Sequence, residues 1–553
     1  MFAFMGKKLF YVIFIMWYLL VANTTFAYTH ADSLLGGNGR GRDWWDVQKY
    51  VLKVEFDTLN QSIKGSVFID LKVPDQARDS IQIDMQEPMV IDNVFEVNGF
   101  AFRELEFERE GNVYWISSAH YPIRDWSNIG YHSIIIYYHG KPKVAVDPPW
   151  GGGFIWNKDS VGNTWAAVAC QGQGASVWWP CKDAQWDEPD RGVDIHLMVP
   201  PNKEAISNGK LVEVTDQGPL KDYHWQVTNP INNYDVTFYI GNYVHWHDTL
   251  VGEKGNLDLD FWVLRNNVAK AKEHFAVVKQ MIHCFEYWLG PYPFYEDGYK
   301  LVDAPYLGME HQSAIAYGNQ YKMGYRGFDK TGTGIGNEFD YIIIHESGHE
   351  WFGNSITAKD MADNWIHEGI TTYTESLFAE CLLGKTKGQK YGRELWRSVM
   401  NNKPIIGDYG ISKEGPGDIY DKGAAIIYMI RAMMNDDEKF RLLLRGLSKE
   451  FHHQTVTTQQ VENYICKATG INLKPFFNKY LRTTMIPQLE YNIKDGELGF
   501  KFNNCVVGFT LPISVTSGKK TIVINPTGEW QKVDWEGGYN IQFANDYLMK
   551  VKD

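Results

Sequence analysis

The sequence has few cysteines and no run of basic residues. Six cysteines lie scattered over 553 residues, which is not the dense framework of a disulfide-stabilised domain. The formal charge is -13 and no basic segment interrupts it, so nucleic acid and anionic membrane surfaces are not expected partners. Hydrophobic residues make up 44% of the chain, which is enough for several buried cores. The composition therefore indicates a folded protein of about three or four domains.

The N-terminal apolar run is too short to cross a membrane. Lys7 and Lys8 precede an apolar run from Leu9 to Ala22, and Thr25-Phe26-Ala27 follows as a cleavage site with small residues. A membrane-spanning helix needs about 20 apolar residues. We therefore predict that residues 1–27 are a cleaved signal peptide and not a stable membrane anchor. The mature protein is expected in a periplasm or outside the cell.

The cysteine positions leave the disulfide pattern open. Most of the six are expected to be buried thiols. Cys170 and Cys181 share one segment and could pair in an oxidising compartment, but the sequence does not require it.

The pentapeptide His345-Glu346-Ser347-Gly348-His349 predicts a zinc site. Two histidines four residues apart share one face of a helix, and Glu368 follows after a spacer of 18 residues as a third ligand. Three protein ligands leave one position for a water molecule, whose pKa zinc lowers to roughly 7. Glu346 lies between the histidines and is placed to take the proton. The pattern predicts one Zn²⁺ per chain and metal-assisted hydrolysis.

Two helices are predicted to carry this site. The first spans about 337–353, with Asn337 as its N-cap. Gly348 in its middle costs about 1 kcal/mol relative to Ala, which indicates that the backbone approaches another group closely there. The second helix spans about 363–382 and places Glu368 in its first turns.

Other segments extend this pattern. They read HESGHEWFGN at 345–354, NWIHEGITTYTE at 364–375, YDKG at 420–423 and CQGQGASVWWPCKDAQWDEP at 170–189. Together they resemble the zinc aminopeptidase family (gluzincins), which includes aminopeptidase N and the leukotriene-epoxide hydrolase. The family carries Gly-Met-Glu-Asn upstream of the metal helix, where this chain has Gly-Met-Glu-His at 308–311. The resemblance extends from about Trp45 to about Tyr491.

The resemblance implies roles for five further residues. Tyr420 matches the catalytic tyrosine, which donates a hydrogen bond to the oxyanion of the tetrahedral intermediate. Gly308, Met309 and Glu310 would bind the substrate, and the Glu310 carboxylate would hold its free α-amino group and make the enzyme an exopeptidase. Gln171 aligns with a second position that contacts this amine.

Three more polar residues lie close to the motifs. His311 and His367 stand where the family commonly has Asn, and we expect polar packing and not metal binding from them. Glu375 lies seven residues after Glu368 on the same helix face. It either orients a ligand histidine through the ring N–H or lies in solvent, and the sequence leaves both open.

The pattern of strands and helices divides the chain into domains. Residues 28–248 contain β-rich runs bounded by turns and predict an all-β domain. Residues 249–485 turn helical, and by resemblance they form a thermolysin-like catalytic zinc domain. Residues 486–553 return to short strands and predict a small domain like a β-sandwich. The expected fold class is multidomain α+β. Many family members continue into a helical domain over the active site, so wider substrate access is expected for a chain that stops at Asp553.

The expected function is that of an exported zinc aminopeptidase, which removes N-terminal residues from peptides with a free N-terminus. An epoxide hydrolase of the same fold is an alternative that no sequence feature supports. A zinc endopeptidase is disfavoured by Glu310. A catalytically silent peptide-binding protein is disfavoured by the intact Glu346 and the three intact ligands.

Overall fold

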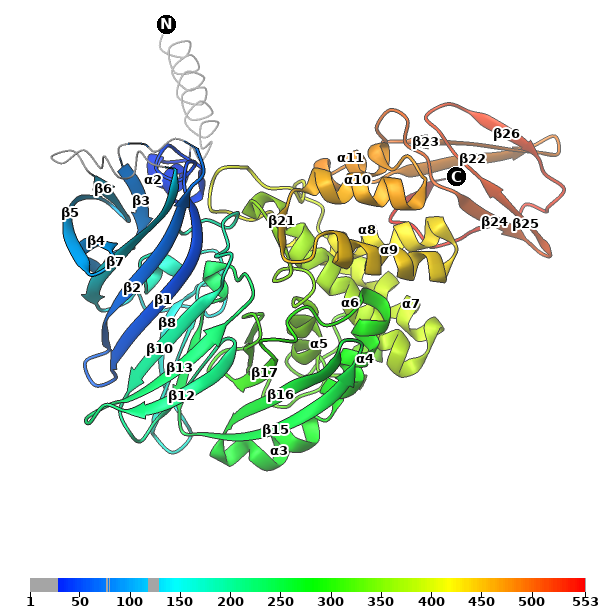
Figure 1. Ribbon diagram of the computed structural model, residues 1–553. Coiled ribbons are helices and arrows are strands. Elements are labelled where there is room, and N and C mark those ends of the chain that lie inside the picture. Colours follow the sequence, from blue (N-terminus) through cyan, green and yellow to red (C-terminus); the bar gives the residue numbers. More distant parts are fainter. Residues whose placement is uncertain (1–27, 76–77, 79, 118–128, 553) are drawn as a thin grey trace, which may run out of the picture.

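The computed structural model describes residues 28–75, 78, 80–117 and 129–552, so the predicted signal peptide lies outside the described residues. Sheets form the N-terminal part, helices dominate the middle, and strands return at the C-terminal end (Figure 1). The predicted α+β fold class is confirmed. Among the described residues, no helix has the length and apolarity needed to cross a membrane.

A large sheet dominates the N-terminal part. Its ten strands run in the order β12-β13-β10-β1-β2-β7-β4-β5-β6-β3. Alternate residues of its strands are buried, as in the pattern of β10, because successive side chains of a strand point to opposite faces. The strands are β1 (Asp46–Asp57), β2 (Ser62–Val73), β3 (Ser80–Asp84), β4 (Val90–Asn98), β5 (Ala101–Glu110), β6 (Val113–Ser117), β7 (Gly130–Gly140), β10 (Val193–Val199), β12 (Lys210–Asp216) and β13 (Lys221–Val227).

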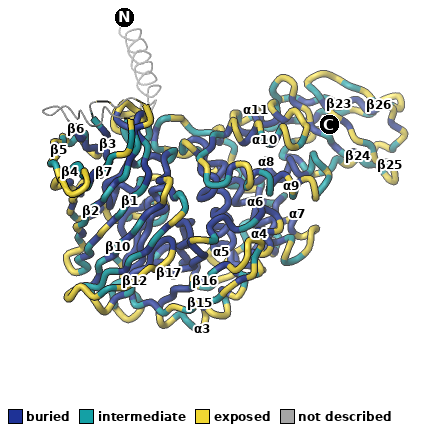
Figure 2. The backbone as a smooth tube through the Cα atoms, in the orientation of Figure 1, coloured by how far each residue is buried: buried dark blue, intermediate teal, exposed yellow. Residues whose placement is uncertain are grey.

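A smaller sheet shares the core of the large one. Phe56 of β1 lies 4.8 Å from Phe238 of the smaller sheet, measured between ring centroids, and Phe154 lies at the same distance from Phe238. The buried tube segments in Figure 2 follow this shared core. The smaller sheet has the order β11-β14-β9-β8, with β8 (Gly153–Lys158), β9 (Thr164–Ala169), β11 (Glu204–Ser207) and β14 (Phe238–Gly241).

A mixed five-stranded sheet opens the next region. Its order is β15-β16-β17-β19-β18, so the short strand β18 lies at one edge. The predicted domain boundary after residue 248 falls inside β15, which pairs along its length with β16. The strands are β15 (Tyr243–Gly252), β16 (Gly255–Leu264), β17 (Tyr299–Asp303), β18 (Gly308–Met309) and β19 (Ile315–Tyr317).

Helices pack beside this sheet, and α6 lies at their centre. Residues 365–379 of α6 are all buried. Gly369 of α6 meets Gly423 of α8 so closely that a Cβ at Gly369 would lie 2.7 Å from the Gly423 Cα. The helices are α3 (Val268–His274), α4 (Val277–Leu289), α5 (Tyr341–Gly348), α6 (Trp365–Leu383), α7 (Lys385–Glu394), α8 (Asp418–Met434), α9 (Asp437–Glu450), α10 (Thr458–Thr469) and α11 (Lys474–Arg482), and a strand pair joins β20 (Ile356–Ala358) to β21 (Gln454–Val456).

One disulfide links two of these helices. Cys284 of α4 is bonded to Cys381 of α6, 97 residues further along the chain. Cys170 and Cys181 are buried free thiols, so the pairing that the sequence allowed between them does not form.

The C-terminal strands form two small sheets, as the sequence predicts. Their orders are β26-β23-β22-β28 and β25-β24-β27. The Tyr480 hydroxyl of α11 donates a hydrogen bond to the Leu548 carbonyl at 2.9 Å and so ties these sheets to the helices. The strands are β22 (Gln488–Lys494), β23 (Glu497–Asn503), β24 (Ile513–Ser517), β25 (Lys520–Ile524), β26 (Gln531–Asp534), β27 (Gln542–Phe543) and β28 (Lys550–Lys552).

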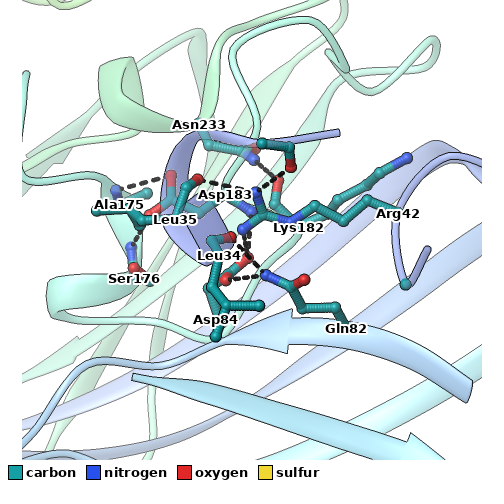
Figure 3. Close-up of polar contacts among 12 residues, drawn as sticks. Leu34, Leu35, Arg42, Gln82, Asp84, Ala175, Ser176, Lys182, Asp183 and Asn233 are labelled. Atoms are coloured by element: carbon teal, nitrogen blue, oxygen red, sulfur yellow. Dashed lines mark hydrogen bonds and ion pairs between the residues drawn. The ribbon is translucent and has the colours of Figure 1, made fainter. Parts of the chain in front are cut away.

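A short helix, α2 (His30–Gly36), precedes the first strand and is held by a buried polar network. The Arg42 guanidinium donates to the Leu35 carbonyl at 2.8 Å and pairs with Asp84 (Figure 3). The Gln82 amide donates to the Leu34 carbonyl at 2.9 Å. The C-terminal end of α2 is thereby fixed to the large sheet.

Candidate metal centre and cleft

Helix α5 begins later and ends earlier than the predicted span of about 337–353, because it runs only from Tyr341 to Gly348. Asp340 is its N-cap, and the carboxylate accepts hydrogen bonds from the backbone N–H of Ile342 and Ile343 at 2.9 and 3.4 Å. The predicted N-cap, Asn337, lies in a separate 3₁₀ turn, because the extended backbone of Phe339 interrupts the helix between them. The predicted N-cap is therefore wrong.

Helix α6 agrees with its predicted bounds and packs directly on α5. Glu368 lies in its first turn. A Cβ at Gly348 of α5 would lie 2.6 Å from the Thr374 hydroxyl oxygen of α6. The predicted close approach at Gly348 is confirmed, and its effect is to bring the two helices that carry the predicted ligands together.

The three predicted metal ligands meet at one point. The Nε2 atoms of His345 and His349 are 3.3 Å apart. They lie 3.4 and 3.3 Å from Oε2 of Glu368. All three side chains are buried, and this group can hold a metal ion.

The chemistry of this group fits Zn²⁺. Two imidazole nitrogens and one carboxylate oxygen are a zinc donor set. Among the described residues, Glu368 Oε2 is buried without a hydrogen-bond partner, as expected for an atom reserved for a cation. Burial alone would raise the pKa of Glu368, but the charges of His349 and His345 lower it well below its usual range. The carboxylate is therefore ionised and ready to bind metal.

Hydrogen bonds from Nδ1, the ring nitrogen that does not face the metal group, fix the orientation of both imidazoles. Nδ1 of His345 lies 2.9 Å from Oε1 of Glu375, whose Oε2 accepts a hydrogen bond from the Tyr391 hydroxyl at 2.6 Å. Nδ1 of His349 lies 2.9 Å from the Phe352 carbonyl oxygen. Both acceptors hold the proton on Nδ1 and leave Nε2 free for a metal. Glu375 is fully buried, so the alternative of a solvated Glu375 is excluded.

Glu346 lies beside the metal group under the edge strand β18. A Cβ at Gly308 would lie only 2.7 Å from Oε1 of Glu346, so no larger residue fits there without moving the carboxylate. Burial raises the pKa of Glu346 to about 7. This value suits a group that exchanges protons near neutral pH.

A second acidic residue faces the same space. Oε1 of Glu310 accepts hydrogen bonds from the Gln171 amide at 2.7 Å and from the Tyr234 hydroxyl at 3.0 Å. One carboxylate oxygen of Glu310, one of Glu346 and a ring nitrogen of His349 all lie within 4.8 Å of one another. Tyr234 belongs to no motif of the sequence, so it could not be predicted as a residue of this site.

Tyr420 lies near the start of α8 and lines the same cavity as Glu310. Its ring stacks on that of His345 with 6.0 Å between the centroids. Burial raises the pKa of the Tyr420 phenol well above its ordinary value, so the phenol keeps its proton and can donate it in a hydrogen bond.

These side chains line one cavity of about 630 Å³. Its walls come from loops of the N-terminal part, from β18 and from the helices and loops around the metal group. Every residue that the sequence singles out as catalytic, metal-binding or substrate-binding contributes to the lining: Gln171, Gly308, Met309, Glu310, His345, Glu346, His349, Glu368 and Tyr420.

The two histidines that replace the usual Asn are packed outside the metal group. Nδ1 of His311 lies 2.8 Å from the Tyr239 hydroxyl. Nε2 of His367 accepts a hydrogen bond from the Ala358 backbone N–H at 2.7 Å. Burial lowers the pKa of each to about 3, so both are neutral. Their geometry agrees with the expected polar packing.

Two imidazoles and one carboxylate that meet at a point, with a second carboxylate beside them in the cavity, form the arrangement expected of a zinc-dependent hydrolase. A family model described as the peptidase family M1 domain matches residues 274–480. This part of the chain is therefore similar to the catalytic domain of the M1 peptidase family. The family and the donor set together imply Zn²⁺ as the cofactor.

Several relatives show how far the similarity extends. Aminopeptidase M1-A of Oryza sativa subsp. japonica is 24% identical over 343 residues, 58% of this chain and 37% of that protein. Aminopeptidase B of Rattus norvegicus is 24% identical over 381 residues, 63% of this chain and 54% of that protein. The chain therefore matches about a third to a half of the length of these curated relatives.

Solved structures share the fold over most of the chain. The M1 zinc metallopeptidase from Deinococcus radiodurans superposes with a TM-score of 0.67 at 18% identity, covering 83% of this chain and 99% of that one.

Proposed function

We propose that this protein is an exported zinc aminopeptidase that hydrolyses the first peptide bond of peptides with a free N-terminus. The observation that carries the proposal is the position of Glu310. Its carboxylate lies in the same cavity as the metal group, within 4.8 Å of Glu346 and His349. A peptide whose ammonium group binds there has its first peptide bond over the metal group.

His345, His349 and Glu368 would hold Zn²⁺, which when bound supplies a Lewis acid that polarises a carbonyl and lowers the pKa of water. Glu346, buried beside the metal group, takes a proton from the attacking water and returns it to the departing amine. The Tyr420 phenol donates a hydrogen bond to the oxygen of the scissile carbonyl as negative charge develops on it.

Glu310 fixes the register of the substrate. A hydrogen bond between a carboxylate and an ammonium group contributes about 1.5 to 3 kcal/mol. The Gln171 amide and the Tyr234 hydroxyl hold the carboxylate in place at 2.7 and 3.0 Å. An endopeptidase has no use for an anchor of this kind at the metal.

Export is proposed from the predicted signal peptide at residues 1–27. The disulfide between Cys284 and Cys381 supports it, because structural disulfides persist in oxidising compartments. N-terminal sequencing of the secreted protein should begin at Tyr28. Retention of the full chain in the cytoplasm would contradict export and leave the catalytic proposal intact.

The decisive experiment compares free and N-acetylated peptides. Acetylation removes the ammonium group, so it should suppress cleavage, and Glu310→Ala should lower kcat/KM on free peptides by at least about tenfold. Glu338→Ala is the control, since Glu338 is exposed and lies outside the cavity lining. Equal cleavage of free and acetylated peptides, or initial cleavage of internal bonds, would refute an aminopeptidase while leaving a zinc hydrolase.

A further inference from the structure

One wall of the cavity is a loop between α7 and α8. Ser412, Lys413 and Glu414 of this loop line the cavity. The Ser412 hydroxyl donates to the Gly172 carbonyl at 3.4 Å, next to Gln171, whose amide holds Glu310. The loop therefore lies at the end of the cavity where the substrate ammonium is proposed to bind.

The loop is fixed in place on one side by the α6 region. The Gly410 backbone N–H donates to the Asp360 carboxylate at 2.8 Å, and the Tyr409 hydroxyl donates to the Asp363 carboxylate at 2.8 Å. These two hydrogen bonds attach the loop to the segment before α6, just ahead of the residues that line the cavity.

The N-terminal segment holds the loop on the other side. A Cβ at Gly36 of α2 would lie 2.1 Å from the Ile411 carbonyl carbon, so the two backbones are in direct contact. The Tyr28 hydroxyl bonds to the Asp408 carboxylate. Since α2 is itself anchored through Arg42 and Gln82 (Figure 3), the loop presents its side chains in a defined position.

Glu414 faces the cavity without a cationic partner. It is exposed to the cavity, and no Lys, Arg or His of the described residues is among the groups that act on its carboxyl. The ammonium of the adjacent Lys413 lies instead 6.0 Å from the ring centroid of Tyr28. Desolvation together with the charge of Glu368 raises the pKa of Glu414 to about 7, although a hydrogen bond with the Asn364 side chain opposes this shift. A cation that entered this recess would favour the ionised carboxyl.

Substrate geometry connects Glu414 to the first residue of the peptide. The α-carbon of that residue carries both the ammonium group and the side chain, so an ammonium on Glu310 directs the side chain toward the nearby walls. These walls are apolar at Met309 and Met361 and acidic at Glu414. A long side chain suits these walls if its methylene groups can pack on the methionines and its terminal positive charge can reach Glu414.

We propose that Glu414 makes the pocket for the first substrate residue selective for lysine and arginine. This rests on the proposed aminopeptidase function and specifies its substrate class. Glu414 pairs with the terminal ammonium or guanidinium group, while the methylene groups pack on the two methionines. The preference is an added specificity and requires no change in the chemistry at the metal group.

The test uses pairs of fluorogenic aminoacyl amides that differ in charge and little in shape. Lysine is compared with norleucine and arginine with citrulline, in the wild-type protein and in Glu414→Gln. The wild type should hydrolyse each cationic member with a kcat/KM at least about tenfold higher than its neutral partner, as expected for a hydrogen bond between charged groups. Glu414→Gln should bring each ratio close to one.

Glu338→Gln is the matched control, because it removes the same charge from an exposed position outside the cavity, and it should keep the wild-type ratios. Equal rates within both pairs for the wild type, or unchanged ratios in Glu414→Gln with a normal melting temperature, would overturn the specificity proposal alone. If none of the four amides and no leucine amide is hydrolysed by zinc-loaded protein, the aminopeptidase function itself fails and the specificity falls with it.

Discussion

Replacing Glu375 by Gln tests the metal centre without touching an atom that binds the metal. The carboxylate is buried, and its two oxygens lie 2.9 Å from His345 Nδ1 and 2.6 Å from the Tyr391 hydroxyl oxygen. Glutamine has nearly the same size but only one acceptor oxygen. If that oxygen keeps the bond to His345, the amide NH₂ faces Tyr391, and the charge that raises the basicity of the imidazole is gone.

The expected cost is a loss of zinc affinity. Removing an outer partner of a metal-binding histidine weakens metal affinity by about 10- to 100-fold, which is about 1.4 to 2.7 kcal/mol. Tyr391→Phe removes only the hydrogen bond to the far oxygen of Glu375. A hydrogen bond to a charged group contributes about 1.5 to 3 kcal/mol, of which only the part that depends on bound zinc is lost, so this variant should lose less affinity than Glu375→Gln.

Competition with a chromophoric zinc chelator measures both constants at one pH. Glu380→Gln is the control, because Glu380 lies on the same helix, carries the same charge and bonds at 2.8 Å to Arg431 instead of a metal-binding residue. Melting curves in excess chelator separate metal affinity from folding. A zinc dissociation constant of Glu375→Gln within twofold of the wild type would refute the role of Glu375 in orienting His345.

Two further predictions concern turnover and acid stability. Tyr420→Phe should lower kcat by about 10²- to 10³-fold with little change in KM, because the phenol acts only as charge develops, and a near-normal kcat in steady-state assays would leave Tyr420 a packing role. Burial lowers the pKa of His311 to about 3, against about 6.5 in the unfolded chain. Its contribution to stability is therefore complete above pH 6.5 and falls by about 1.4 kcal/mol per pH unit toward pH 3. Urea unfolding of His311→Asn between pH 7 and 5 should show a shallower decline than the wild type, and equal slopes would contradict this.

Helix geometry explains why the metal group could be predicted from the sequence. The spacing of His345 and His349 places both on one face of any helix that contains them. The same periodicity placed Glu375 on the face of Glu368, but it could not decide between an orienting and a solvated residue. That choice depends on the burial of α6, which neighbouring helices produce from distant parts of the sequence.

Contacts between distant segments explain what the sequence could not predict. Asn337 and Asp340 are both good N-caps, and only the extended backbone of Phe339 selects Asp340. The partners Cys284 and Cys381 are 97 residues apart, whereas the nearer pair that the sequence suggested remains reduced. The disulfide depends on tertiary packing, and the backbone of Phe339 is not evident from residue type, so neither outcome has a local sequence pattern.

Local helix geometry positions the groups proposed for catalysis, whereas contacts between distant segments position the residue proposed for selectivity. The groups proposed for chemistry lie on the three helices α5, α6 and α8 or directly beside the ends of α5 and β18, and this geometry constrains them to a few possible positions. Glu414 lies on a loop that has no regular structure and is positioned by Asp360 and by the backbone of Gly36, a residue almost 380 positions away. A change in the N-terminal segment can therefore alter the pocket for the first substrate residue without moving any metal ligand, so relatives with the same metal motif need not share its selectivity.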